Sequence, residues 1–579
     1  MDCILHEDYL KIKDDPINLF SAIYTIKDKE GKKQFIIDIN NKDNIDICKY
    51  AVKVIENGHD TRYVCLFLED VIGELKLNKE SLFEYFQIIN QKLQEKIGNT
   101  TRYFEIQNIT VNQPIFAEEF LEYLMLSDEP FVFNYIVEII LNLNTIDIQE
   151  KHSRLLLMAN SNIETKSISG ISGLGRIQYQ SEDNQELFNK TLLCFDFLIK
   201  QERHIINGVI IKSLARLYLF GDQIISRLIN LSKRNDPNIL LEIVIFLSFN
   251  YKNIKKEYYF ETLLLSLTKV NSVYPWIINE LNMLLHSMVK DTNCQINLIV
   301  NFLIKWMSDS DCKPNKIASL HLLHITFDGI YTNINILQEI LLLLFNNDNL
   351  FAPQLAAYII TSNNFQKEWK IYLNPNSLSD LSDIDILYIC RKILGQFIQP
   401  DIMISLFYSI LIGKKGNSKI VELICGCFHE YISYNYPETT IETVTGLLDK
   451  IEANIPCEDI LQRILEDTKQ IKKDRIEKKI LKELTPSKRE LYLLHKEEWQ
   501  SNQKYIDAAN KKSVMASLVS TSYIKYGKSA SYYIDEQITE TTPFKEFSFS
   551  MERNYNVIVD PVGFDIDRFY FQNIQRGEN

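Results

Sequence analysis

The feature that most constrains the fold of this chain is a long series of short helices with apolar stripes, between about residues 116 and 451. Asn, Asp, Gly or Pro interrupts the apolar periodicity about every 15–20 residues, and little of the intervening sequence alternates like a strand. Helices this short bury one face each and need neighbours to cover it. We therefore predict a mainly α fold, in which helix pairs stack side by side as an α-solenoid.

Prolines mark where several of these helices begin. Asp236 precedes Pro237, which places a capping residue directly before a proline at the first helical position. A proline there loses no intrahelical hydrogen bond, whereas inside a helix it costs about 3 kcal/mol. A proline at the predicted start of a helix recurs at Tyr274-Pro275, Lys313-Pro314, Ala352-Pro353, Gln399-Pro400 and Tyr436-Pro437. The clearest helices predicted in this way cover 184–200, 205–220, 223–233 and 237–249.

In helix length and pairing, the region of about 115–452 resembles the HEAT and armadillo class of helical repeats. The resemblance rests on these two features and not on a repeat consensus, and no tetratricopeptide or ankyrin signature is visible. It implies an extended surface whose concave face holds peptides, domains or nucleic acid. The resemblance therefore favours binding over catalysis.

The predicted solenoid, 113–455, is flanked by segments of different character. In 1–112, short β-branched and aromatic runs at 34–39, 63–68 and 104–111 indicate strands beside a helix at 80–96, so this part is a small α+β region. An irregular cap of helices on the solenoid explains the same runs, and the sequence leaves both interpretations open.

Beyond the solenoid, 456–511 is predicted to form long charged helices, at 461–484 and 487–510. The tail, 512–579, is rich in Ser, Thr and aromatic residues. Short strands or extended segments are indicated there by Phe544, Phe547 and Phe549, and then by Tyr555, Val557 and Val559, which gives a β-like C-terminal tail. A tail this aromatic is expected to dock on the last repeats or on a partner.

The net charge of −13 argues against a general binder of phosphate backbones and fits a protein partner with basic patches better. The ten cysteines are scattered, mostly within apolar runs such as that around Cys194, which is typical of reduced core cysteines in a cytoplasmic protein. No apolar run reaches about 18 residues, so we expect no membrane insertion. We also expect no cofactor.

Three motifs invite a chemical reading. Cys425, Cys427 and His429 contain zinc-ligand types, but on a helix the two cysteines point about 200° apart, which favours a structural role. His321 and His324 lie three residues apart in an apolar context that favours packing over metal or acid–base chemistry. The glycines of 170–175 lack the lysine of a phosphate-binding loop, so close helix packing or a loop between repeats is the plainer reading.

Two further sets are candidates for contact with a partner. The electrostatic set lies on a predicted helix of this acidic chain and consists of Lys469, Lys472, Lys473, Arg475, Lys478, Lys479 and Lys482. A solvated helix face, or docking onto the acidic solenoid, explains the same run. The interface set consists of Tyr523, Tyr526, Tyr532, Tyr533, Phe544, Phe547 and Phe549, which a small capping core explains equally.

From these observations we expect a non-enzymatic scaffold or adaptor in a multiprotein complex, which binds a protein partner along the helical-repeat surface. The alternative is an accessory protein for nucleic acid, acting in genome maintenance or in defence against foreign DNA through the basic helix at 469–489. A third hypothesis, an enzyme on a helical-repeat scaffold, rests on analogy of fold. No known catalytic motif is present, and no catalytic residue is assigned.

Overall fold

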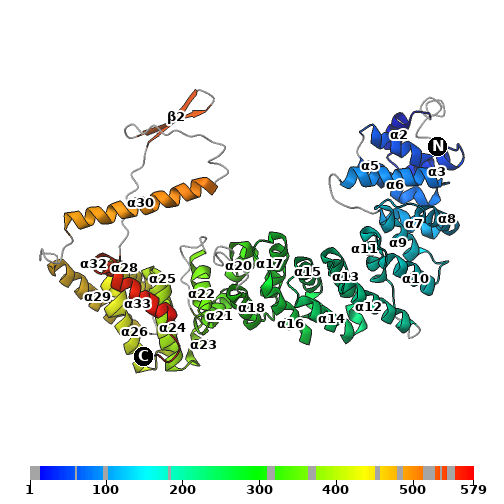
Figure 1. The fold of residues 1–579 in the computed structure, drawn as a ribbon. Helices are drawn as coiled ribbons and strands as arrows, with labels where there is room; N and C mark the ends of the chain where they lie inside the picture. Colours follow the sequence, from blue (N-terminus) through cyan, green and yellow to red (C-terminus); the bar gives the residue numbers. More distant parts are fainter. Residues whose placement is uncertain are drawn as a thin grey trace. The chain divides into compact units, whose positions relative to one another are not determined.

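The structure is a computed structural model of the 579-residue chain. It describes residues 14–58, 61–94, 102–179, 184–309, 320–362, 373–449, 457–478, 487–512, 529–534, 537–543 and 554–578. The chain divides into two compact units (Figure 1). The first unit is Met1–Ser287 with Asp309–Pro314, and the second is Met288–Ser308 with Asn315–Asn579.

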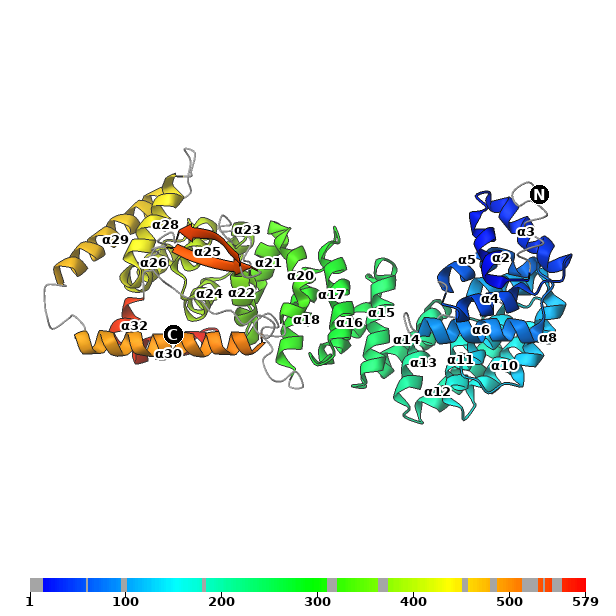
Figure 2. The same ribbon diagram turned by 90° about the horizontal axis from the view of Figure 1, so that it is seen from above.

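The first unit is a two-layer stack of helices (Figure 2). The odd layer consists of α3 (Lys29–Asn41), α5 (Thr61–Val71), α7 (Tyr103–Asn112), α9 (Val132–Asn142), α11 (Glu164–Leu174), α13 (His204–Arg216) and α15 (Pro237–Ile254). The even layer consists of α2 (Pro16–Thr25), α4 (Ile47–Glu56), α6 (Lys79–Gln94), α8 (Pro114–Met125), α10 (Ile148–Ala159), α12 (Gln185–Ile199), α14 (Asp222–Ser232) and α16 (Tyr258–Ser266). Short 3₁₀ turns are η1 (Ile72–Glu74), η3 (Tyr218–Phe220) and η4 (Leu267–Lys269).

Successive helices of the odd layer pack on one another without interruption, from α3 through α5, α7, α9, α11 and α13 to α15. Consecutive odd and even helices also pack together, as in α10 with α11 and α12 with α13. The central helix α9 is buried almost all round, because neighbours cover it in both layers. This helix-pair packing is compatible with the predicted solenoid.

The strands predicted in 1–112 are wrong, because all three runs are helical. In α7 the buried residues are Glu105, Ile106, Ile109 and Thr110, which is the spacing of one helix face. In α3 the Asp28 carboxylate accepts a hydrogen bond from the Gly31 amide at 2.8 Å and so caps the helix. The described part of 1–112 therefore extends the helical stack, as the alternative interpretation held.

The proline pattern is largely confirmed. Pro237, Pro275, Pro400 and Pro437 are each the first residue of a helix, namely α15, α17 (Pro275–Val289), α25 (Pro400–Lys414) and α28 (Pro437–Asp449). Pro353 is the third residue of α22 (Phe351–Ser362), and Pro314 lies outside the described residues. The helix expected at 205–220 ends at Arg216, and η3 follows it.

The second unit is also a stack of helices. Its helices are α18 (Ile296–Ser308), η5 (Leu320–Leu323), α20 (His324–Tyr331), α21 (Ile334–Phe345), α22 (Phe351–Ser362), α23 (Pro375–Ser379), α24 (Asp383–Gln396), α25 (Pro400–Lys414), α26 (Ser418–Cys427), the π-helical η6 (Phe428–Ile432), α27 (Ser433–Asn435), α28 (Pro437–Asp449), α29 (Glu458–Lys478), α30 (Lys488–Lys512), α32 (Tyr555–Val559) and α33 (Pro561–Asn573). Packing runs from α18 through α21 and α22 to α24, and on through α25 and α28 to α29.

The C-terminal tail is only partly extended. A two-stranded antiparallel hairpin joins β1 (Ser529–Ile534) to β2 (Gln537–Pro543). The strand expected at Tyr555, Val557 and Val559 is wrong, because these residues form α32, which Asn554 caps through its side chain. Their alternating apolar residues fit a single helical turn equally well. Among the described helices, none has the length and apolarity that a membrane span requires.

The two units divide the chain inside the predicted solenoid segment, after Ser287. The four segments 1–112, 113–455, 456–511 and 512–579 therefore stay a prediction about sequence character. In the described residues, the first segment and the start of the second form one continuous stack, since α5 packs on α7 and α7 on α9.

Candidate binding surface and polar clamp

A line of polar side chains crosses the odd layer of the first unit, with one residue from each of five successive helices or their ends. We call this set the polar line. It consists of Tyr103 on α7, Glu138 on α9, Arg176 directly after the α11 cap, Arg216 on α13 and Glu242 on α15. The sequence analysis did not single out any of these residues.

Arg176 and Glu138 form the closed half of this line. The Arg176 guanidinium donates to both carboxylate oxygens of Glu138, with Nη2 2.8 Å from Oε2 and Nη1 against Oε1. The Glu138 side chain is only 4% exposed, so its charge depends on this bidentate pair. The hydrogen bond to Glu138 raises the pKa of Arg176. The guanidinium also lies 5.9 Å from the centre of the Tyr103 ring.

Arg216 is the open half of the line. Its guanidinium lies 3.5 Å from the Ser172 hydroxyl, at the limit of a hydrogen bond, and no carboxylate of the described residues forms an ion pair with it. The pKa of Arg216 is lowered, first by burial against its neighbours and next by the like charge of Arg176. Arg216 ends α13, where the helix dipole favours a cation, so its position also has a structural rationale.

Glu242, the last residue of the polar line, is half-buried. Burial raises the pKa of its carboxyl group, even though the positive charges of Lys212 and Arg216 act in the opposite direction. Desolvation therefore outweighs two nearby cations at this position. Charges along the polar line interact through a medium less polarisable than bulk water.

Glycines bring the helices of this surface close together. A Cβ atom on Gly170 would lie 2.3 Å from the Ala159 backbone nitrogen, and one on Gly175 would lie 2.5 Å from the Ser213 Cβ on α13. Gly175 directly precedes Arg176, and Ser213 is three residues before Arg216, so this contact sets the two arginines side by side. The reading of the 170–175 glycines as close packing is confirmed, because 170–174 belongs to α11.

The predicted basic run is partly engaged within the chain. Lys472 forms an ion pair of 3.4 Å with Glu438. Arg475 donates to the Tyr434 carbonyl, and its guanidinium lies 5.3 Å and 4.1 Å from the ring centres of Tyr434 and Tyr555. These contacts join α29 to α28, to α27 and to α32.

The other basic residues lie elsewhere. Lys469 and Lys473 are exposed, Lys478 ends α29, and Lys479 and Lys482 lie outside the described residues. The candidate interface aromatics are still more scattered. Tyr532 and Tyr533 lie on β1, whereas Tyr523, Tyr526, Phe544, Phe547 and Phe549 lie outside the described residues.

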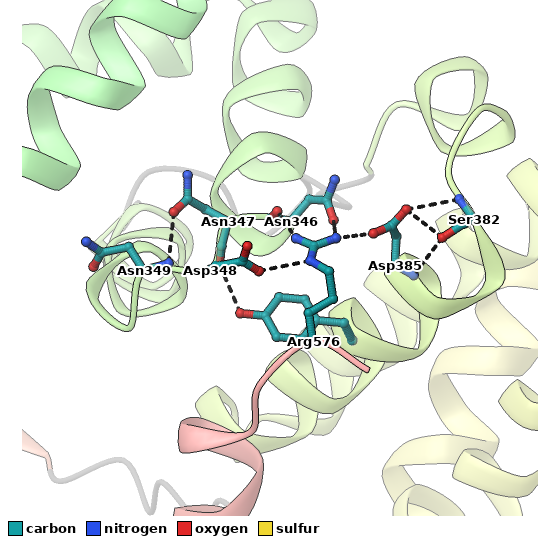
Figure 3. A network of polar contacts seen from close by, with 8 residues as sticks. Asn346, Asn347, Asp348, Asn349, Ser382, Asp385 and Arg576 are labelled. Carbon is teal, nitrogen blue, oxygen red and sulfur yellow. Dashed lines mark hydrogen bonds and ion pairs between the residues drawn. The ribbon is translucent and has the colours of Figure 1, made fainter. Parts of the chain in front are cut away.

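The C-terminal end of the chain is fastened to the second unit by Arg576 (Figure 3). Its Nε donates to Asp348 at 2.9 Å and its Nη1 to the Asn346 side chain at 2.8 Å. It also donates to the Asp385 carboxylate and to the Asn346 carbonyl, and it lies 4.8 Å from the centre of the Tyr388 ring. We call these five residues the C-terminal clamp.

Helix α33 lies directly on α24, next to the clamp. A Cβ atom on Gly395 would lie 2.8 Å from the Gln572 backbone nitrogen, so the two helices touch backbone to backbone. The Lys392 ammonium is fully buried and donates to the Gln572 carbonyl at 2.7 Å. The expectation that the tail docks on the last repeats is confirmed for 554–578.

The metal and acid–base candidates lie on four helical segments of the second unit. Cys425 and Cys427 are partly buried on α26, His429 is exposed on η6, and His321 and His324 are exposed near the start of α20. Within the described ranges, no group of three or more His, Cys, Asp or Glu side chains is placed to hold a metal ion.

The polar line and the clamp show how this chain uses arginine. One set exposes a guanidinium that forms no ion pair among the described residues, and the other surrounds a guanidinium with acceptors from its own chain. Comparison with protein-family models, with curated proteins and with solved structures found no match.

Proposed function

We propose that this chain is a non-enzymatic scaffold or adaptor, which binds a protein partner along the helical-repeat surface of its odd layer. We further propose that its stack of helix pairs belongs to the α-solenoid class represented by HEAT and armadillo repeats. In such proteins each repeat contacts only its neighbours, so stacking produces a long surface rather than an enclosed pocket.

The observation that carries this proposal is the polar line. Residues on or directly after five successive helices of one layer contribute to this strip. Tyr103, Arg176 and Arg216 are exposed, Glu242 is half-buried, and Glu138 is buried against Arg176. A strip built from many repeats suits contact with an extended segment or with a domain, because no single repeat supplies the whole site. The exposed side chain of Arg216 gives this strip a feature that a partner can read.

The experiment is affinity purification of the full-length chain from its own cells, with and without nuclease, followed by mass spectrometry. Wild type is compared with Arg216→Glu and with Lys190→Glu, a matched reversal on even helix α12, where Lys190 pairs with Glu186 at 2.6 Å. We expect protein partners that survive nuclease, are depleted by Arg216→Glu and are kept by Lys190→Glu.

Two outcomes would contradict the proposal. If the two variants capture the same partners as wild type, the partner does not use the odd layer around Arg216. If the co-purifying proteins disappear with nuclease and nucleic acid is recovered, the chain acts on nucleic acid instead. Charge reversal at Lys469 and Lys473, the exposed members of the basic run, would then be the next comparison.

A further inference from the structure

We infer that the odd layer around Arg216 receives an acidic segment of the partner, with a partner carboxylate paired to the Arg216 guanidinium. This inference rests on the proposed function and specifies the chemistry of the partner at the same surface. Four observations carry it: the local charges, the limited access of water, the apolar side chains beside the charges, and the range over which charge acts.

The local charges leave a positive excess. The cations on this strip are Arg176, Lys212 and Arg216, and the carboxylates are Glu138 and Glu242. Glu138 is fully engaged by the bidentate contact with Arg176. Lys212 and Arg216 therefore share Glu242, and they lie four residues apart on the same face of α13. An incoming carboxylate would complete a set of charges that the chain itself leaves incomplete.

Partial desolvation strengthens the attraction between Arg216 and a partner carboxylate. A charge pair is roughly four times stronger at the effective dielectric constant of about 20 near a protein surface than in bulk water. Burial is the first cause of both the raised pKa of Glu242 and the lowered pKa of Arg216, so neighbouring groups partly desolvate the two charges, although the Arg216 side chain is exposed. Such partial desolvation strengthens a contact that would gain little in bulk water.

Apolar side chains are exposed on the same two helices as the charges of this strip. On α13, Ile205, Val209, Lys212 and Arg216 are spaced at intervals of four, three and four residues, so they form one stripe. Ile205 is 56% exposed, and Phe249, seven residues after Glu242 on α15, is 84% exposed. The fitting segment therefore carries apolar residues next to its acidic ones, since both kinds of surface are offered side by side.

The net charge of the chain does not oppose this partner. The whole chain carries −13, which by itself favours a basic partner. At physiological ionic strength, however, charges farther apart than about 8 Å are largely screened from one another. The residues that meet the partner therefore decide its chemistry, and at Arg216 those residues are cationic.

The test is selection from a random-peptide display library on the purified full-length chain, followed by fluorescence anisotropy with the enriched peptides. We expect enrichment of Asp or Glu next to apolar residues, and binding that weakens as salt is added. Arg216→Glu should weaken binding by at least about tenfold, as loss of a poorly hydrated charge pair does. Arg216→Lys should keep part of the affinity, and Lys190→Glu should keep all of it.

Several results would overturn the inference. These are the failure to enrich any peptide, the enrichment of peptides without acidic residues, and equal affinity for wild type and Arg216→Glu. Thermal unfolding of each variant identifies loss of folding, and Arg216→Gln repeats the test without introducing a negative charge. If the inference fails while co-purification still depends on Arg216, the scaffold proposal stands and only the acidic chemistry is wrong.

Discussion

Arg576 in the second unit and Arg216 in the first are both partly exposed arginines, but they stand in opposite electrostatic situations. Arg576 meets two carboxylates and an asparagine from its own chain, together with an aromatic ring. Arg216 meets one hydroxyl at 3.5 Å. Because a guanidinium offers five donors, the number of its acceptors separates Arg576, which fastens the tail, from Arg216, which meets one hydroxyl among the described residues.

A third arginine, Arg102, pairs with two carboxylates of which one is fully buried. Arg102 donates to Glu105 at 2.7 Å and to Glu69 at 3.0 Å, so two carboxylates share one cation. Glu105 is fully buried, with one oxygen lacking a hydrogen-bond partner among the described residues. Burial raises the pKa of Glu105 to about 7, and Arg102 only partly opposes this effect. Arg102 and Arg576 thus each pair with two carboxylates, whereas Arg216 forms no ion pair among the described residues.

The largest loss of stability is expected when Glu138, the buried carboxylate that pairs with Arg176, is removed. Glu138→Ala should reduce the free energy of unfolding by about 4 kcal/mol, since it removes one partner of a buried ion pair. Chemical denaturation measures the loss. Glu138→Gln, which keeps the shape and some hydrogen bonding, is the matched control and should cost less. Equal stability of wild type and Glu138→Ala would mean that the closed half of the polar line is not structural.

The buried Glu105 beside Arg102 should make the stability of the fold depend on pH. Because the pKa of Glu105 is about 7 in the folded chain and near 4.5 in the unfolded one, the folded state retains a proton that the unfolded state releases. Stability should therefore fall as the pH rises from about 4.5 to about 7, by on the order of 3 kcal/mol. Glu105→Gln should flatten this part of the profile. A slope unchanged in Glu105→Gln would assign the titration to another group.

The clamp should respond to Arg576→Ala by local opening. We expect a loss of about 2 kcal/mol, because several hydrogen bonds of a charged group disappear together. Amide exchange in 554–578 should speed up, with little change in the first unit. Arg568→Ala, on the same helix α33, is the comparison variant. Unchanged exchange in 554–578 would show that the contact of α33 with α24 holds the tail without Arg576.

The smallest effect on stability is expected at the open arginine. Arg216→Ala should change the free energy of unfolding by no more than about 0.5 kcal/mol, since no ion pair within the described chain is lost. Thermal unfolding of Arg216→Ala beside Arg576→Ala makes the comparison direct. A loss as large as that of Arg576→Ala would show that Arg216 supports the fold, through the end of α13, rather than a partner.

Much of the fold could be predicted from local patterns. The apolar stripes and the helix-opening prolines such as Pro237 and Pro400 act within one or two turns, so a sequence displays them directly. The N-terminal strands were wrong because runs such as 63–68 are too short for their period to be read. In the folded chain, neighbouring helices bury one face of α5, which consists of Val64, Cys65, Leu68 and Val71. Those neighbours favour the helix, and the sequence of the run alone does not show them.

The site was harder to predict, because its contacts join residues far apart in sequence. Arg576 meets Asp385 across 191 positions, and no local pattern marks that partnership. Glu138 could have been predicted to form an ion pair. It is a lone charge within the apolar run of α9, and such a charge needs a partner when buried. No local pattern marks Arg216, because one arginine at a helix end is commonplace.

Hydrogen exchange of the full-length chain, with and without the partner recovered by co-purification, tests most directly whether the odd layer binds that partner. We expect slower exchange on binding in α11, α13 and α15, with the strongest protection around Arg216 and little change in the even helices α12 and α14. Protection confined to the even layer or to the second unit, with exchange in α13 unchanged, would contradict this expectation.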